Sequence, residues 1–141
     1  MRLADTPPVN HVIYAKNLQP MAAFYRRTLA LSVVEDSDAC VVIGDGLVEI
    51  VLVRIPDRIA ATIEWTSPPV LREETPIKAS FVVDDLDRVA AEAAATGGGV
   101  RTIDSAWVWR GQRHLDGYDP EGNVVQFRQR VADIEAGQAG G

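Results

Sequence analysis

An internal repeat constrains the fold more than any other feature of this sequence. The segment "VNHVIYAKNLQPMAAFYRRTLALSVVED" begins with apolar residues at alternate positions, which is typical of a strand. Asn17 then suits the N-cap of a helix, because its side chain can accept a hydrogen bond from the first turn. The residues that this helix is expected to bury are Leu18, Met21, Ala22, Tyr25 and Leu29. Another strand follows at once.

The segment "PIKASFVVDDLDRVAAEAAATGGGVRTID" in the second half has the same plan. It predicts a strand at 78–83, an N-cap at Asp85, a helix at 86–95 that ends in glycines, and a further strand. The inward residues of this helix are expected to be Leu86, Val89, Ala90 and Ala93. Short strands are predicted at 31–36, 39–43 and 47–54 in the first half and at 99–103, 106–109, 113–117 and 123–129 in the second. Each half therefore predicts a βαβββ module.

Two such modules cannot each stand alone. One helix covers one face of a sheet, so the other faces must be buried against each other or against another chain. We therefore predict an α+β fold in which two βαβββ modules form a curved mixed sheet around a shared cleft. The domain is predicted at 1–130, with modules at about 9–55 and 77–130 and a linker at 56–76 with at most one helical turn. Residues 131–141 are predicted to be a flexible tail.

Composition excludes several classes of protein. Hydrophobic residues make up 47% of the 141 residues and charged residues 24%, as in ordinary globular domains. No apolar run approaches the roughly 20 residues that a membrane span needs, and the start "MRLADTPPVN" lacks the apolar core of a signal peptide. The net charge of −6 and scattered basic residues argue against nucleic-acid binding. We expect a cytoplasmic protein with neither nucleic acid nor membrane as a partner.

Three stretches resemble the vicinal oxygen chelate superfamily, also called the glyoxalase, bleomycin-resistance and extradiol-dioxygenase group. They are "HVIYAKNLQPMAAFYRRTLAL", "IKASFVVDDLDRVAAEAAATGG" and "GYDPEGNVVQFR", and with the repeat they extend from about Val9 to Arg130. This superfamily includes isomerases, lyases, dioxygenases, antibiotic-modifying transferases and non-catalytic drug-binding proteins, so the fold alone does not choose a function. Since its members commonly form homodimers, the resemblance implies a homodimer here.

The resemblance also implies where a metal would bind. In metal-using members, the first and last strands of each module supply the ligands, and counting from the matched motifs places Lys78 and Gln126 at two of these positions. Asn10 and Glu49 correspond in the first module, with His11 one residue late and, by alternation, on the opposite face unless a bulge intervenes. A protonated lysine has no lone pair, and glutamine ligates weakly. We therefore expect no metal in the usual place and no other cofactor, the alternative being a metal held by His11, Glu49 and one further ligand.

Lys78 supports two interpretations of equal weight. As a cation in the cleft, it would anchor a substrate carboxylate, phosphate or enolate oxygen, or act in proton transfer if its pKa were depressed. Alternatively, it forms a plain ion pair that bridges the modules, for which Glu49 is the nearest partner by topology. Lys78 and Glu49 are accordingly the weak candidates for catalysis.

The segment "SAWVWRGQRH" adds aromatic candidates. Trp107 and Trp109 share one face of a short strand, where they form a flat apolar wall that suits planar or cationic molecules or simply packs in the core. Tyr14 shares the cleft face of the first strand as a possible donor to a ligand. His114 shares a face with Asp116 and is a weaker candidate for a displaced base.

Three functions remain open on the sequence alone. The first is a metal-independent protein that binds a small molecule in the cleft. The second is a metal-dependent or lysine-assisted enzyme of the same superfamily, either a lyase or isomerase or a dioxygenase, and the third is a dimerisation module with an empty cleft. For the first, the candidate ligand-binding residues are Lys78, Glu49, Gln126, Tyr14, Trp107 and Trp109.

Overall fold

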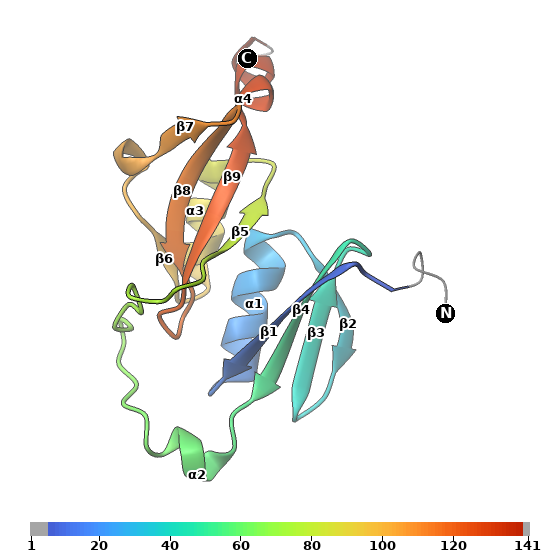
Figure 1. Ribbon diagram of the computed structural model, residues 1–141, viewed down its shortest axis with the longest axis vertical. Coiled ribbons are helices and arrows are strands. Elements are labelled where there is room, and N and C mark those ends of the chain that lie inside the picture. Colours follow the sequence, from blue (N-terminus) through green and yellow to red (C-terminus); the bar gives the residue numbers. More distant parts are fainter. Residues whose placement is uncertain (1–5, 140–141) are drawn as a thin grey trace.

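The first module is a four-stranded sheet covered by one helix. The computed structural model describes residues 6–139. The elements of this module are β1 (Val9–Ala15), α1 (Leu18–Thr28), β2 (Ser32–Asp36), β3 (Cys40–Gly44) and β4 (Val48–Arg54). The strand order is β1-β4-β3-β2, in which β1 runs parallel to β4 and the other pairs are antiparallel (Figure 1). The predicted βαβββ plan is confirmed in this half.

The second module repeats the plan with one extra short strand. Its elements are β5 (Ala79–Val82), α3 (Leu86–Ala95), β6 (Gly99–Val100), β7 (Trp107–Trp109), β8 (Gln112–Tyr118) and β9 (Val124–Arg130). The strand order is β5-β9-β8-β6, and β7 pairs with the first residues of β8, from Gln112 to His114. β6 is shorter than the strand predicted at 99–103, because the chain leaves the sheet and forms a 3₁₀ turn at Ile103–Ser105.

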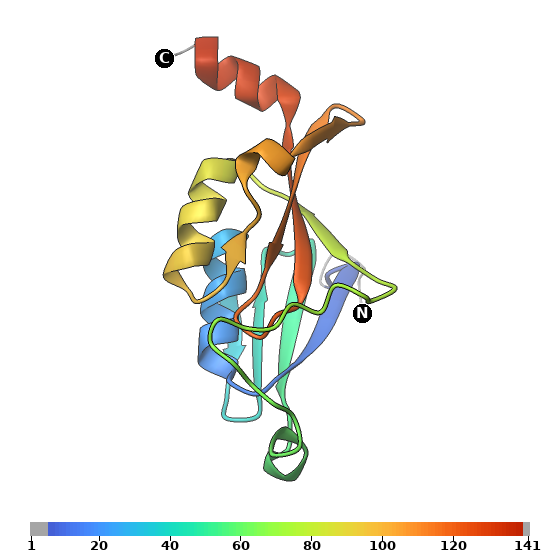
Figure 2. The same cartoon turned by 90° about the vertical axis from the view of Figure 1, so that its left-hand side faces the viewer.

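The predicted α+β fold is confirmed, and its sheet is divided into two. α1 and α3 pack side by side and cover the same side of both sheets (Figures 1 and 2). The core lies between the helices and the sheets and includes Phe24, Tyr25, Ile50 and Phe127. The faces without a helix therefore point to the same side of the molecule and do not cover each other. We call them the open faces of the first and second sheets.

The "DPEGN" turn joins the second module to the start of α1. Asn17 occupies the predicted N-cap position but makes no capping hydrogen bond with its side chain. Instead, the carboxylate of Glu121 accepts the backbone N–H of Lys16, at 2.9 and 3.0 Å, and that of Asn17, at 3.0 Å. Asp119 lies buried beside it and accepts a hydrogen bond of 2.6 Å from the Tyr25 hydroxyl. The turn is thus one polar contact between the modules, beside the ion pair of Arg27 with Glu92 and the hydrogen bonds from Arg88 to the backbone oxygens of Arg27 and Thr28.

The segment between the modules and the C-terminal segment each contain a helix. The predicted single turn in the linker is α2 (Asp57–Ala60). The segment predicted as a flexible tail, 131–141, is helical from Val131 to Ala139 (α4), and its last two residues lie outside the described part. The ion pair between Arg130 and Asp133, at 2.9 Å, supports the first turn of α4. The mobility of this segment stays a prediction.

Candidate functional site

Strand register gathers polar side chains on the open face of the second sheet. Ser80 of β5, Gln126 of β9 and Asp116 of β8 are aligned neighbours across three strands. One step along, Arg128 lies opposite His114. Side chains two residues apart share a face of a strand, and the intervening residues Phe81, Phe127 and Leu115 are buried in the core. All the polar residues just named therefore point away from α3.

Lys78 pairs with an acid of its own sheet. Its Nζ lies 3.0 Å from each carboxylate oxygen of Asp116 and 5.8 Å from the centre of the Trp107 ring. The expected partner, Glu49, is wrong for this chain, because register places Asp116 two strands away within the same sheet. The side chains of Lys78 and Asp116 are 39% and 19% exposed, so solvent screens the pair. The Lys78 ammonium remains accessible beside the aromatic wall.

Gln126 is held by its neighbour on β5. The Ser80 hydroxyl donates to the Gln126 side-chain oxygen at 2.6 Å. That oxygen is thus already engaged in a hydrogen bond within the sheet. The amide nitrogen is left to donate toward the open face.

The two tryptophans of β7 flank a buried histidine. Trp107 stacks on His114 with ring centres 5.3 Å apart and planes inclined by 14°, and the Trp109 ring centre is 5.9 Å away. His114 is only 3% exposed, and its Nδ1 lies 3.0 Å from the backbone oxygen of Gln112. The imidazole of His114 is therefore part of the aromatic wall, in contact with both tryptophans. Strand alternation had placed His114 on this face, but its contact with the tryptophans depends on the pairing of β7 with β8, which the sequence does not display.

A cavity of about 430 Å³ opens next to this wall, at the hairpin that joins β7 to β8. We call it the hairpin cavity. The residues that line it are Ser80, Trp109, Arg110, Gln112, His114, Gln126 and Arg128. Two of the six candidate ligand-binding residues, Gln126 and Trp109, thus line the cavity together with the weaker candidate His114, while Lys78 and Trp107 lie beside it. The sequence analysis did not include Arg128 and Gln112. Their only signal was strand alternation, since each lies two residues from a candidate, Gln126 or His114.

The remaining candidates lie on the open face of the first sheet. The Asn10 side-chain amide donates to Glu49 at 3.3 Å, and Tyr14 is 66% exposed. His11 is aligned with the buried Ile50 on the opposite face, and its ring centre is 5.4 Å from that of Phe81. His11 and Glu49 therefore do not meet. None of the five best-formed cavities in residues 6–139 brings Glu49 or Tyr14 together with Lys78.

The residues at the superfamily's metal positions do not fit a divalent cation. Glu49 is the one carboxylate among the four positions, and Lys78 already donates to Asp116. Catalytic zinc and non-haem iron sites need about three protein ligands of the His, Cys or carboxylate type. Within residues 6–139, no group of three or more such side chains is arranged to hold a metal ion. We therefore derive no chemistry through a metal.

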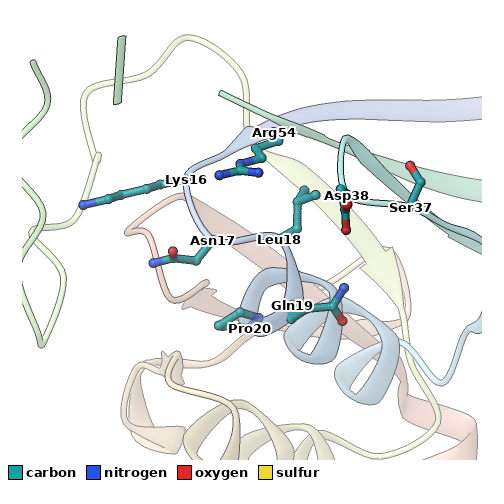
Figure 3. Close-up of a pocket in the computed structure, with 8 residues that line it drawn as sticks. All are labelled: Lys16, Asn17, Leu18, Gln19, Pro20, Ser37, Asp38 and Arg54. Carbon is teal, nitrogen blue, oxygen red and sulfur yellow. The ribbon is translucent and has the colours of Figure 1, made fainter. Parts of the chain in front are cut away.

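Other cavities lie away from the hairpin, and two of them adjoin α1 or the contact between the modules. One, of about 290 Å³, adjoins the first turn of α1, where Gln19 and Pro20 meet Ser37, Asp38 and Arg54 (Figure 3). The Lys16 side chain points away from this group. A second, of about 250 Å³, lies between the modules, with Leu29 and Val48 on one side and Phe81 and Arg128 on the other. None of the six candidate ligand-binding residues lines either cavity.

The architecture and the comparisons with known proteins agree. Two βαβββ modules with their helices packed together are the fold of the glyoxalase and bleomycin-resistance class of proteins. Residues 10–127 match the glyoxalase-like domain family, and the chain belongs to that family. The resemblance seen in the sequence is thereby confirmed. A search of curated proteins found no match.

Solved structures share the fold at low sequence identity. A glyoxalase/bleomycin resistance protein/dioxygenase family enzyme from Burkholderia phytofirmans PsJN is 17% identical, with a TM-score of 0.64 over 89% of this chain and 99% of its own. The fosfomycin resistance protein FosX from Mesorhizobium loti is 15% identical, with a TM-score of 0.58 over 86% and 88%. A bleomycin resistance determinant encoded on transposon Tn5 is 15% identical, with a TM-score of 0.55 over 89% and 98%.

Among the residues from 6 to 139, no helix combines the length and apolar character that a bilayer crossing requires.

Proposed function

We propose that this protein binds a small molecule on the open face of its second sheet, without the superfamily's divalent metal. The observation that carries the proposal is the hairpin cavity, of about 430 Å³, which has Gln126 and Trp109 in its wall. A volume of this order suits a small organic ligand, and an aromatic surface with a few polar groups is typical of such sites. Lys78 and Trp107 extend the site beyond the cavity.

Two of the structural neighbours support a role in binding small molecules. FosX is described as a fosfomycin resistance protein, and the Tn5 protein as a bleomycin resistance determinant. Their identity to this chain is 15%, so they support the class of function and not the choice of ligand. The ligand must be inferred from the residues of the site itself.

The site includes, in this proposal, a second copy of the chain. The open faces of one chain point to the same side, and the exposed Val12 and Tyr14 leave the first one partly apolar. A two-fold axis would lay the first sheet of each copy over the second sheet of the other, which covers all four open faces at once. Glu49 and Tyr14 of one copy would then close the site that Lys78, Gln126 and the tryptophans of the other begin. A homodimer is therefore part of the proposed function.

Ligand screening and metal analysis test the proposal together. Small molecules are titrated into purified protein while tryptophan fluorescence is recorded, and each response is repeated with Trp109→Phe. Trp65→Phe serves as the matched control, because Trp65 lies in the linker and its Nε1 donates to the backbone oxygen of Ala60. We expect quenching that is reduced in W109F and retained in W65F. Responses that are equal in both variants would place the ligand elsewhere.

The metal and the dimer have their own outcomes. Stoichiometric, tightly held metal in the purified protein would contradict the metal-independent site, and chemical conversion of a bound ligand would move the protein to the enzyme class. Light scattering after size-exclusion chromatography is expected to give twice the mass of 15.3 kDa. A monomer at micromolar concentration that still binds the ligand would remove the second copy from the proposal.

A further inference from the structure

The hairpin cavity has an unbalanced charge. Two of its lining residues are Arg110 and Arg128, and none is an aspartate or a glutamate. The chain as a whole carries a net charge of −6, so this local excess of cations is opposite to the surroundings. The neighbouring acid, Asp116, is already engaged by Lys78 through both carboxylate oxygens. Such a cavity attracts an anion rather than a cation.

Arg128 has a donor that lacks an acceptor. One terminal nitrogen donates to the Gln112 side-chain oxygen at 2.6 Å. Its Nε is buried and, among the residues from 6 to 139, finds no hydrogen-bond partner. An unmet buried donor on a charged group is costly, and an anion beside the guanidinium would offset this cost, through a charge-assisted hydrogen bond to the part of the group that lines the cavity. The guanidinium of Arg128 is also free of any ion pair within the described chain.

Arg110 adds a second cation at the rim of the cavity. Its Cζ lies 5.3 Å from the centre of the Trp109 ring. The turn that carries it is tight, since Arg110 and Gly111 have φ values of 53° and 71°. These left-handed conformations fit the two-residue hairpins of antiparallel strands. The turn therefore holds a guanidinium and an indole side by side at the same edge.

His114 offers the complementary acceptor. Because a carbonyl oxygen only accepts, the contact of Nδ1 with the Gln112 backbone oxygen assigns the tautomer that carries its proton on Nδ1. The other nitrogen, Nε2, then carries a lone pair and makes no hydrogen bond within the described chain. Stacking on Trp107 fixes the orientation of the ring. The cavity thus combines two cationic donors with one imidazole acceptor.

We infer that the hairpin cavity binds a small organic anion that also carries a hydroxyl group. The carboxylate or phosphate group of the ligand is held by Arg128 and Arg110, the hydroxyl donates to His114 Nε2, and the planar part of the ligand lies on Trp109. This inference rests on the proposed function, since it names the ligand class of the same site. The inference also excludes cationic drugs as ligands of the cavity. The two tryptophans alone would suit a cation equally well.

Matched probes test the charge and the hydroxyl separately. Mandelate carries an aromatic ring, a carboxylate and an adjacent hydroxyl, whereas methyl mandelate lacks the charge and phenylacetate lacks the hydroxyl. Phenyl phosphate distinguishes a phosphate from a carboxylate, and benzyltrimethylammonium tests a cation. We expect calorimetry to show binding of mandelate or phenyl phosphate at least about tenfold tighter than of the neutral and cationic probes, the factor set by one charge-assisted hydrogen bond. Phenylacetate should bind more weakly than mandelate.

Variants locate the effect. Arg128→Gln should weaken binding of the anionic probe by about tenfold or more, while Arg26→Gln, an exposed arginine on α1, should leave it unchanged. If Arg128→Gln fails to fold, as judged by circular dichroism, Arg110→Gln on the exposed turn replaces it. His114→Gln should reduce the preference for mandelate over phenylacetate. Equal affinity of the anionic probe for Arg128→Gln and wild type would overturn the inference.

The outcomes distinguish this inference from the proposed function. Binding of the neutral or cationic probe as tightly as the anion, with loss in Trp109→Phe, would refute the anion while leaving a small-molecule site in the cavity. Absence of binding by every probe, charged or neutral, would count against both.

Discussion

Glu121 should contribute more to stability than a typical exposed carboxylate, because it accepts two backbone N–H groups of the other module just before α1. It is 7% exposed and accepts the backbone N–H groups of Lys16 and Asn17. In Glu121→Ala both donors lose their acceptor at a partly buried site. Each unmet donor costs about 1–3 kcal/mol, and partial access of water favours the lower half of that range. The expected loss in the free energy of unfolding is about 2–3 kcal/mol.

Two effects bound this number. The backbone N–H of residue 121 still donates to Asp119 in the variant, so the turn itself keeps its hydrogen bond of 2.9 Å. Removing a negative charge beside the buried Asp119 also offsets part of the loss. Glu121→Gln retains one oxygen that accepts and should lie between wild type and Glu121→Ala.

Urea denaturation followed by circular dichroism measures the effect. Glu64→Ala is the matched control, since Glu64 is exposed in the linker and makes no hydrogen bond in the described chain; its effect should stay within about 0.5 kcal/mol. An unchanged slope with denaturant would show that stability alone has changed. If Glu121→Ala lost no more stability than the control, the hydrogen bonds to Lys16 and Asn17 would contribute nothing and the reasoning would be wrong.

Three further predictions concern the core, the ion pair and the metal. Burial, followed by the charge of Asp119, raises the pKa of the Tyr25 phenol well above its usual value. The stability that the neutral phenol supplies is therefore complete below pH of about 10 and lost as the pH rises, because the unfolded phenol then ionises. Tyr25→Phe should cost about 1.5–3 kcal/mol at neutral pH, and its deficit in urea denaturation should shrink above pH 10. Lys78→Ala should cost less than about 1 kcal/mol, since its pair with Asp116 is partly exposed, yet should weaken binding of an anionic ligand in calorimetry. Zinc, nickel, manganese and iron at high micromolar concentrations should leave the melting temperature unchanged, whereas a metal at 100 times its Kd would add about 2.7 kcal/mol.

The regular elements were largely accessible from the sequence, since they follow from local periodicity. The helix predicted at 86–95 is α3, with its N-cap at Asp85 as expected, because the spacing of apolar residues and the capping chemistry act over a few residues. α1 begins where predicted but buries Phe24 and Thr28 as well, since α3 packs against the helix and widens its buried face. Local signals thus predicted where the helices begin and end better than how many of the residues of α1 are buried.

The contacts that define the candidate site were less accessible, because they join residues far apart in the chain. Lys78 and Asp116 are 38 positions apart, and Glu121 and Asn17 are 104. Such pairs depend on strand register and on how the modules dock, neither of which a single sequence encodes in a local pattern. Alternation correctly placed His114 on the same face as Asp116, and Gln126 was placed by counting from the matched motif, while the partner expected for Lys78 was wrong. The sequence therefore predicted which face carries the site but not which side chains on it are already paired.

The pairing explains where a ligand can bind. At the two positions that correspond to metal ligands in the second module, Lys78 is engaged by Asp116 and Gln126 by Ser80. These partners lie in the same sheet. Lys78 and Gln126 therefore already have hydrogen-bond partners within the protein. The donor without a hydrogen-bond partner, on Arg128, and the cations without a carboxylate partner lie further along, toward the β7–β8 hairpin. Because a donor without a partner gains more from a ligand than a donor that is already paired, we expect the proposed ligand to be recognised mainly at the hairpin rather than at Lys78 and Gln126.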